Sequence, residues 1–289
     1  MTAQSSAAGD VIADALSTAA QSAGYPTTHV EQLRTGNNYI YADRSNGLIY
    51  RVPVLERQAD NLAQENGLLL DLASAGAPIV APSQQDPLRL STGDLATVWP
   101  LGGQPDPNPA VSLAPTLASL HDVPPVDGLR RWDGFERGHR RVELARATGV
   151  PSELVDEVSQ RLSTLEAQIP DWTADKVVHG DPHTGNLVKI DGQHLLIDLD
   201  DIATGSPEID LAVLRTAYTR FDVIPGSWDQ FLAAYGRPAT RDTIDWFARV
   251  RQVSMVAWLF TLWDLRPESQ QEAIHRVSTL DTAAVWNPL

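Results

Sequence analysis

The chain has 289 residues, 43% of them hydrophobic, and its 22 Lys and Arg against 37 Asp and Glu give a formal charge of −15. At roughly 150 residues per domain, this length predicts two domains or one two-lobed domain. Such negative charge excludes a sequence-independent grip on nucleic acid or on an anionic membrane. The absence of cysteine excludes disulfides, thiolate metal sites and cysteine nucleophiles.

Several nucleotide and hydrolase motifs are also absent. The two lysines, Lys176 and Lys189, follow no glycine, which excludes a phosphate-binding loop of the Gly-x4-Gly-Lys type. The N-terminal residues lack the basic and apolar regions of a signal peptide, and no apolar run reaches about 18 residues. We therefore expect a cytoplasmic protein that is not inserted in a membrane.

Residues 1–99 predict a small N-terminal lobe built on an antiparallel sheet. Apolar residues at helical spacing indicate helices. Two runs in which apolar and polar residues alternate, with Asn46-Gly47 between them, indicate a β-hairpin. One helix is inserted after the third strand, and the sheet is expected to have five strands. The predicted helices span 10–23 and 58–73, and the predicted strands include 39–41, 48–52, 78–82 and 95–99.

Residues 100–109 are too rich in Pro and Gly for a regular element and predict a hinge. The remainder, 110–289, predicts a mainly helical lobe that also contains short strands. The fold class is therefore α+β, with two lobes. The expected helices are 111–121, 142–148, 152–168, 210–218, 228–235 and 241–265, and the expected strands are 176–179, 187–190 and 195–198.

The strongest chemical signal is His179-Gly180-Asp181-Pro182-His183-Thr184-Gly185-Asn186. In phosphoryl transfer an Asp accepts the proton of the acceptor hydroxyl, and an Asn oxygen nearby binds Mg²⁺. Asp198 ends the apolar run Leu195-Leu196-Ile197, where a carboxylate can hold the metal ion that bridges nucleotide phosphates. These three polar residues predict a kinase-type site.

The same residues, with Ile-Asp-Leu-Asp-Asp and the segment Gly205 to Ala212, resemble the aminoglycoside phosphotransferase family of protein-kinase-like small-molecule kinases. The resemblance implies transfer of a γ-phosphate from ATP or GTP to a hydroxyl of a small-molecule acceptor. It implies that Asp181 is the catalytic base and that Asn186 and Asp198 bind Mg²⁺. It further implies that His179 braces the loop and that Asp210 is a buried acid supporting it.

Two other functions use the same residues. A nucleotide-binding pseudokinase would keep the fold without turnover, although an intact set of Asp181, Asn186 and Asp198 argues against it. Alternatively, His179, Asp181 and His183 alternate as ligands do in some metallohydrolases. Such a site needs further ligands, for which His194 and the acids 198–201 are the nearest candidates.

The N-terminal lobe contains no lysine to bind the nucleotide phosphates. Arg51, on the third predicted strand, occupies the corresponding place, and a guanidinium can neutralise phosphate charge. Glu65 on the inserted helix is the expected ion-pair partner, with Glu56 as the second candidate. The alternative is that Arg51 is an ordinary surface cation.

Two further segments are expected to contact the nucleotide. The turn around Gly36 and Asn38 would cover the phosphates, although one glycine alone also fits an ordinary turn. Pro100 has no N–H, so adenine would have to use the Trp99 carbonyl and the Leu101 amide.

The acceptor is expected to be aminoglycoside-like or another amine-bearing molecule, with the alternative that the acidic surface serves solubility alone. The net charge and the acids Asp198, Asp200, Asp201 and Glu208 near the catalytic loop would attract a cation. Aromatic residues between 246 and 263 could form an acceptor wall but more often form core. The arginines between 130 and 146 are interleaved with Glu136 and Glu143, which predicts a solvated helix face.

Overall fold

The structure is a computed structural model that describes residues 3–27, 29–35, 38–54, 57–103, 109–221, 224 and 226–288. The chain divides into two compact units. The first comprises Met1–Pro105, Val126–Gly128 and Val188–Ile197, and the second comprises Asp106–Pro125, Leu129–Leu187 and Asp198–Leu289. Among the described helices, none is long and apolar enough to cross a membrane.

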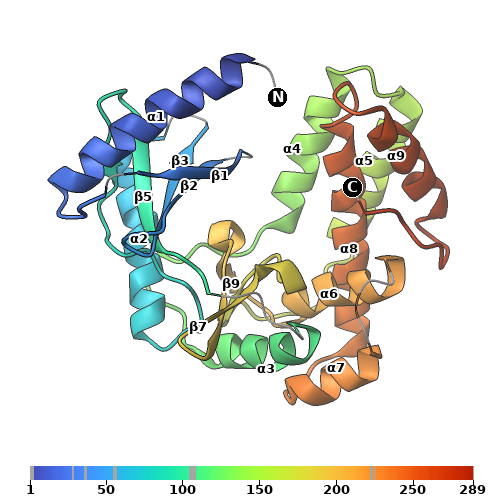
Figure 1. Ribbon diagram of the computed structural model, residues 1–289. Helices are drawn as coiled ribbons and strands as arrows, with labels where there is room; N and C mark the ends of the chain where they lie inside the picture. The colour runs from blue at the N-terminus through green and yellow to red at the C-terminus, as the bar shows by residue number, and fades with distance from the viewer. Residues whose placement is uncertain are drawn as a thin grey trace. The chain divides into compact units, whose positions relative to one another are not determined.

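The first unit is built on a five-stranded antiparallel sheet (Figure 1), which confirms the predicted N-terminal sheet. Its spatial order is β1-β2-β3-β5-β4, so the last two strands are exchanged relative to the sequence. The strands are β1 (Glu31–Thr35), β2 (Asn38–Asp43), β3 (Leu48–Pro53), β4 (Leu88–Arg89) and β5 (Leu95–Pro100).

Helix α1 (Ala3–Ser22) packs on this sheet and begins earlier than the predicted residue 10. Its fully buried Leu16 and Ala20 belong to one apolar cluster with Tyr41 of β2 and Tyr50 of β3. Strand β3 alternates buried and half-buried residues along its whole length, as a half-exposed strand should. Helix α2 (Ala59–Ser74) follows β3, as predicted.

The predicted hairpin joins β2 and β3 and is organised by the buried carboxylate of Asp43. Asp43 accepts hydrogen bonds from the Ser45 hydroxyl at 2.6 Å and from the Asn46 side-chain amide at 2.7 Å. These donors hold the pKa of Asp43 below its ordinary value although burial acts in the opposite sense. Gly47 adopts φ +64°, a conformation that favours glycine, which explains why Asn-Gly marks this turn.

The predicted strand at 78–82 is wrong. Only Ile79 forms a bridge there, a parallel one with Leu196, and the fourth strand of the sheet is β4 at Leu88–Arg89. Pro78 and Pro82 lack the N–H groups that a ladder needs, so the apolar residues between them are buried without forming a strand.

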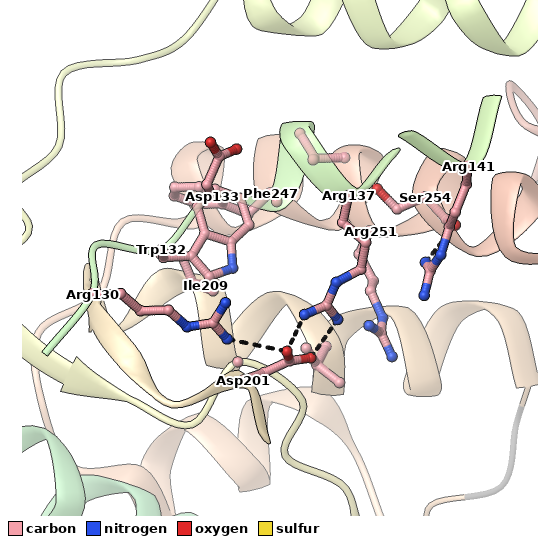
Figure 2. A pocket seen from close by; sticks show the side chains of 14 residues that line it. Arg130, Trp132, Asp133, Arg137, Arg141, Asp201, Ile209, Phe247, Arg251 and Ser254 are labelled. Atoms are coloured by element: carbon pink, nitrogen blue, oxygen red, sulfur yellow. Dashed lines mark hydrogen bonds and ion pairs between the residues drawn. The ribbon is translucent and has the colours of Figure 1, made fainter. Parts of the chain in front are cut away.

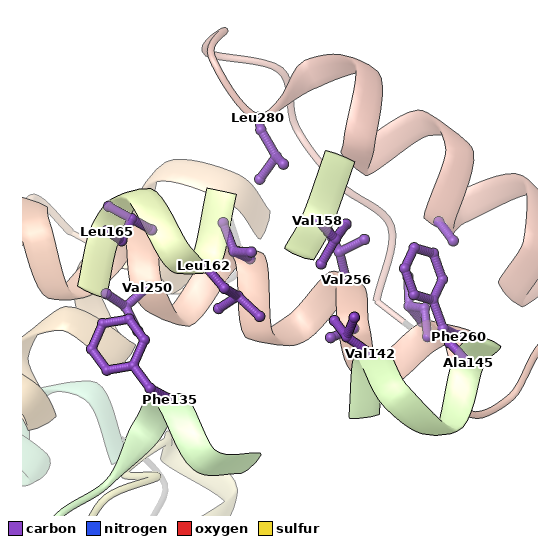
Figure 3. Packing of buried hydrophobic residues seen from close by; sticks show 14 of the residues in the cluster. Phe135, Val142, Ala145, Val158, Leu162, Leu165, Val250, Val256, Phe260 and Leu280 are labelled. Atoms are coloured by element: carbon purple, nitrogen blue, oxygen red, sulfur yellow. The ribbon is translucent and has the colours of Figure 1, made fainter. Parts of the chain in front are cut away.

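The second unit is mainly helical and has one large apolar core. Helices α4, α5, α8 and α9 surround it, and Figure 3 shows Val142, Leu162 and Val256 meeting there. Gly138 lets α4 approach α5 closely, since a Cβ at that position would lie 3.1 Å from a Leu162 methyl group. The helices are α3 (Pro109–Asp122), α4 (Gly134–Arg146), α5 (Ser152–Glu166), α6 (Glu208–Thr216), α7 (Trp228–Tyr235), α8 (Arg241–Phe260) and α9 (Pro267–Thr279), and a π-helical turn spans Ala217–Phe221.

Helix α9 was not predicted, because most of the residues it buries are not apolar. Its buried positions include Ser269, Glu272 and Arg276, so hydrophobic periodicity gives no signal. Arg276 bonds Glu272 at 2.7 Å and lies over the Trp286 ring at 5.0 Å. The C-terminal aromatics, by contrast, form core: Trp246, Phe247, Phe260 and Trp263 are all buried in the main cluster.

Short strands carry the loops between the helices. β6 (Lys176–Val178) pairs antiparallel with β9 (Ala203–Gly205), and the segment at Arg131 forms a parallel bridge with β9. β7 (Leu187–Ile190) and β8 (Gln193–Leu196) form a separate two-stranded sheet. Single-turn helices occur at Thr184–Asn186 and Leu199–Asp201.

We expect Leu162→Ala to test the core of the second unit. Leu162 is fully buried on α5, so its truncation should lower the free energy of unfolding by about 2–5 kcal/mol. The measurement is urea unfolding followed by tryptophan fluorescence. Leu144→Ala is the matched control, because Leu144 on α4 is 57% exposed and its truncation should change stability by less than about 0.5 kcal/mol. Equal effects of both substitutions would contradict this assignment of the core.

Candidate active site

The loop between β6 and β7 carries Asp181 and Asn186, and it belongs to the second unit up to Leu187. Its geometry depends on Gly180, which has φ +86° and whose added Cβ would lie 2.6 Å from the Asp201 carbonyl oxygen. A side chain there is excluded twice, by backbone conformation and by space. The loop is thereby pressed against the segment that begins at Asp198.

Asp210 on α6 holds the start of this loop, which confirms the structural role implied by the family resemblance. Its fully buried carboxylate accepts the amides of His179 and Gly180, each at 2.8 Å. It also contacts the Nε2 of His121 at 2.9 Å, and the His121 Nδ1 lies 2.7 Å from the Tyr235 hydroxyl. Burial and then the negative charge of Asp210 raise the pKa of Tyr235, so this hydroxyl stays protonated.

The two histidines of the loop brace it. The His179 Nδ1 accepts the Asp181 amide at 3.3 Å, and the His183 Nδ1 accepts the Gly185 amide at 3.0 Å, where it caps the turn Thr184–Asn186. Within the described part of the chain, no three His, Asp or Glu side chains converge as metal ligands. The structure therefore gives no support to the metallohydrolase interpretation.

Asn186 and Asp198 suit a hard cation. The buried Asn186 donates its side-chain N–H to the Asp181 carbonyl at 3.1 Å, which leaves its amide oxygen as a potential ligand. Asp198 has φ +63°, a conformation uncommon for a residue with a side chain and typical of functional turns. Desolvation lowers the pKa of the His183 imidazole, and the nearby carboxylates of Asp181 and Asp198 offset part of this lowering. Two oxygen donors fit Mg²⁺, which keeps several water or phosphate ligands.

Asp181 has an unexpected partner in Arg251 of α8. The guanidinium donates to one oxygen of the Asp181 carboxylate at 2.6 Å, and about a third of each side chain remains exposed. Among the described residues, no side chain bonds the other carboxylate oxygen. That oxygen is available to accept a proton from a bound hydroxyl.

A cavity of about 60 Å³ adjoins Asp181 through Gly180 and Arg251 (Figure 2). Its walls combine the apolar side chains of Trp132, Ile209, Val213, Phe247 and Val250 with the guanidinium groups of Arg130, Arg137, Arg141 and Arg251. The arginines between 130 and 146 therefore do not all lie on a solvated helix face. Arg137 and Arg141 are half-buried, because α4 turns this side toward α8 and the loop at Asp201.

Two of the four acids that were expected to attract a cation are engaged by protein groups. Asp201 forms a two-point ion pair with Arg137 and a contact with Arg130 at 3.3 Å, as Figure 2 shows. Glu208 accepts hydrogen bonds from the Ser206 hydroxyl and from the Thr240 amide. Asp201 and Glu208 are therefore not free to bind an amine.

In the first unit, Arg51 and Trp99 lie on the same face of the sheet, and the guanidinium lies 5.3 Å from the indole centroid. The expected ion pair between Arg51 and Glu65 is not the one that forms. Glu65 pairs with Arg57, which lies just before α2 and reaches its carboxylate along the helix. Glu56, the second candidate, lies outside the described residues.

The other predicted nucleotide contacts are in the same unit. The Leu101 amide donates to the Gly47 carbonyl at 2.7 Å, since it continues the β3–β5 ladder beyond Pro100. It is therefore not free to bind a base, contrary to expectation. Asn38 begins β2 opposite Pro53, and Gly36 lies outside the described residues.

Sequence reasoning missed the cavity arginines. Arg251 contacts Asp181 across 70 positions of the chain, and no periodicity relates the two residues. One signal was present, because Arg137 and Arg141 are four residues apart and like charges at that spacing are unfavourable on a solvated helix.

The sheet of the first unit and the helices and catalytic loop of the second define a protein-kinase-like fold, as predicted. Solved structures with this fold include choline kinase LicA from Streptococcus pneumoniae, at TM-score 0.64 and 17% identity over 92% of this chain and 99% of that one. Amicoumacin kinase hAmiN in complex with AMP-PNP, Ca²⁺ and Ami matches at TM-score 0.63 and 17% identity, covering 89% and 90%. The GDP and kanamycin complex of APH(2")-IIia matches at TM-score 0.62 and 19% identity, covering 88% and 93%.

These identities are low enough that the likeness establishes the fold alone. A comparison with curated proteins gives no significant match. The family is established by sequence, since the model of the phosphotransferase enzyme family matches residues 32–247. The chain belongs to this family and is, by that membership, a small-molecule kinase.

We expect Asp210→Asn to disturb the catalytic loop. An amide oxygen can replace only part of the carboxylate that accepts two backbone amides, so stability should fall by about 2–4 kcal/mol. Displacement of Asp181 should lower kcat at least about tenfold. Urea unfolding and ADP release measure the two effects. Asp229→Asn on the exposed end of α7 is the control, and wild-type behaviour of Asp210→Asn would contradict the bracing role.

The Asp201 ion pair predicts a pH dependence. Burial alone would raise the pKa of Asp201, but hydrogen bonds from Arg137 hold it below its ordinary value. Its contribution to stability should therefore be complete above the ordinary pKa of about 3.9 and be lost as the pH falls through the lower, folded-state pKa. The stability difference between wild type and Asp201→Asn should shrink from pH 6 to pH 3, and Arg137→Gln should weaken this trend. A difference that is constant with pH would contradict the pairing.

Proposed function

We propose that this protein transfers the γ-phosphate of ATP or GTP to a hydroxyl group of a small molecule that binds in the cavity beside Asp181. The observation that carries the proposal is the position of Asp181: it is braced by His179 and Asp210, and one carboxylate oxygen has no side-chain partner in the described part of the chain. Similar structures support the donor, since they include complexes with AMP-PNP and with GDP.

In the proposed reaction the acceptor oxygen forms a bond to the γ-phosphorus, and the bond from that phosphorus to the bridging oxygen breaks. The nucleoside diphosphate leaves with the electron pair of that bond. Asp181 takes the hydroxyl proton, and the loop contacts described above hold its carboxylate in place. Arg251 fixes the orientation of Asp181 through the other oxygen.

Asn186 and Asp198 would hold Mg²⁺, which when bound neutralises charge on the nucleotide phosphates. The fit rests on the free amide oxygen of Asn186 and on the turn that presents Asp198. Arg51 remains our candidate for a phosphate contact in the first unit, since residues 1–99 contain no lysine. Stacking on Trp99 would limit the motion of its guanidinium.

The acidic sequence predicts an amine-bearing acceptor, but the side chains of the site support that prediction less well. The similar structures include a choline kinase and a kanamycin complex, which favours a cation. However, Asp201 and Glu208 are engaged within the protein, and four arginines line the cavity. The reaction proposed here requires only the hydroxyl.

Asp181→Asn should test the catalytic role. The substitution keeps the side-chain shape but removes the proton acceptor, so kcat should fall by a factor of about 10² or more. AMP-PNP with Mg²⁺ should still raise the melting temperature, because Asp181 contacts the acceptor rather than the nucleotide. The assay is ADP release with Mg²⁺-ATP over a panel of amino alcohols, aminoglycosides, macrolides, sugars and hydroxy acids.

Asp229→Asn is the matched control, as an exposed Asp outside the site. Retention of more than about a tenth of wild-type kcat in Asp181→Asn would rule out the assigned role. Nucleotide binding without ADP release on any acceptor would instead indicate a pseudokinase.

A further inference from the structure

The four arginines of the cavity are not equivalent. Arg130 and Arg137 face Asp201, and Arg251 faces Asp181, so each of these three has a carboxylate. Arg141 has none among the described residues. Its one hydrogen bond there is donated to the Ser254 carbonyl and is long, at 3.4 Å, and in Figure 2 no dashed line joins its guanidinium to Asp201.

Arg141 is also surrounded by positive charge. Burial, followed by repulsion from Arg137 and Arg251, lowers the pKa of its guanidinium to about 10, although the more weakly acting Asp201 raises it. A half-buried cation without a counter-ion costs stability, and hydrogen bonding to one carbonyl offsets little of that cost. Packing alone therefore does not explain an arginine at this position, whereas binding of an anion does.

A second unsatisfied group lies in the same wall. The hydroxyl of Ser254 is buried, lines the cavity and has no hydrogen-bond partner among the described residues. Buried hydroxyls normally have partners, and an exception calls for an explanation. The Ser254 hydroxyl and the Arg141 guanidinium both donate hydrogen bonds, so together they form a site that suits a small anionic group.

The remaining walls suit the body of an organic molecule. Trp132 and Phe247 meet edge to face, with ring centroids 5.4 Å apart, and Ile209, Val213 and Val250 extend this apolar surface. Gly180, the neighbour of Asp181, lines the same cavity. A molecule bound there has its anionic group at Arg141, and its hydroxyl can reach the catalytic loop.

We infer that the phosphoryl acceptor is a hydroxyl-bearing organic anion, a carboxylate or a phosphate ester, whose anionic group pairs with Arg141 and the Ser254 hydroxyl. The inference rests on the proposed function for the role of the hydroxyl. The inferred acceptor is negatively charged, whereas the acidic composition of the chain predicts a positively charged one.

The test measures binding to the full chain with three fluorinated probes of similar size and different charge. Trifluoroacetate, trifluoroacetamide and 3,3,3-trifluoropropylammonium are titrated at pH 7 and constant ionic strength and followed by fluorine NMR. Trifluoroacetate should bind at least about tenfold more tightly than the other two. Displacement by acetate or by inorganic phosphate then distinguishes a carboxylate site from a phosphate site.

Arg141→Gln should lower trifluoroacetate affinity at least about tenfold, whereas Arg140→Gln, one residue away and exposed, should stay within about twofold of wild type. The melting temperature of Arg141→Gln should be unchanged or higher, because an uncompensated cation is removed. A fall of more than about 4 °C would show a structural role and overturn the inference. Equal binding of the three probes, or no binding of trifluoroacetate up to about 20 mM, would also overturn it.

Failure of this inference is distinguishable from failure of the proposed function. ADP release on a neutral or cationic acceptor, with no preference for anionic probes, would refute the anion site and leave the kinase assignment standing. Selective anion binding at Arg141, with no ADP release on any hydroxy acid or hydroxyl-bearing phosphate ester, would refute the proposed transfer to the molecule bound there.

Discussion

The buried carboxylate of Asp210 is the contact on which the catalytic loop depends. A carboxylate removed from water must be surrounded by donors, and Asp210 finds them in the amides of His179 and Gly180 and in His121. This requirement ties α6 to the end of β6 and, through His121 and Tyr235, to α3 and α7. Asp181 follows two residues after His179. The hydrogen bonds of Asp210 therefore set the backbone position of Asp181 without involving the Asp181 side chain.

Net charge and local charge have opposite signs in this protein. The chain carries −15 overall, yet the cavity beside Asp181 is lined by four arginines. Carboxylates in this region neutralise particular guanidinium groups or cap backbone amides, as Asp133 does at the start of α4. Electrostatic interactions over a few ångströms outweigh the average charge, because more distant charges are screened by solvent and salt.

The first unit shows how sheet geometry assigns partners. Alternation along β3 places Arg51 on the face opposite the core, where Trp99 of the neighbouring strand lies beside it. The same ladder continues past Pro100 and engages the Leu101 amide. Glu65 forms an ion pair with Arg57, which is close in sequence and precedes the same helix. Neighbours in the fold, rather than charge alone, decide which pairs form.

The sequence by itself determined the features that depend on short segments: the hairpin at Asn46-Gly47, the sheet-and-helix division, and the contiguous loop from His179 to Asn186. Each is encoded by local backbone preference, periodicity or motif spacing. Tertiary structure alone decided that Arg251 meets Asp181, that no described carboxylate pairs with Arg141 and that α9 buries Glu272 and Arg276. Those arrangements depend on how helices far apart in sequence pack, and a charged residue placed by packing carries no periodic signal of where its partner lies.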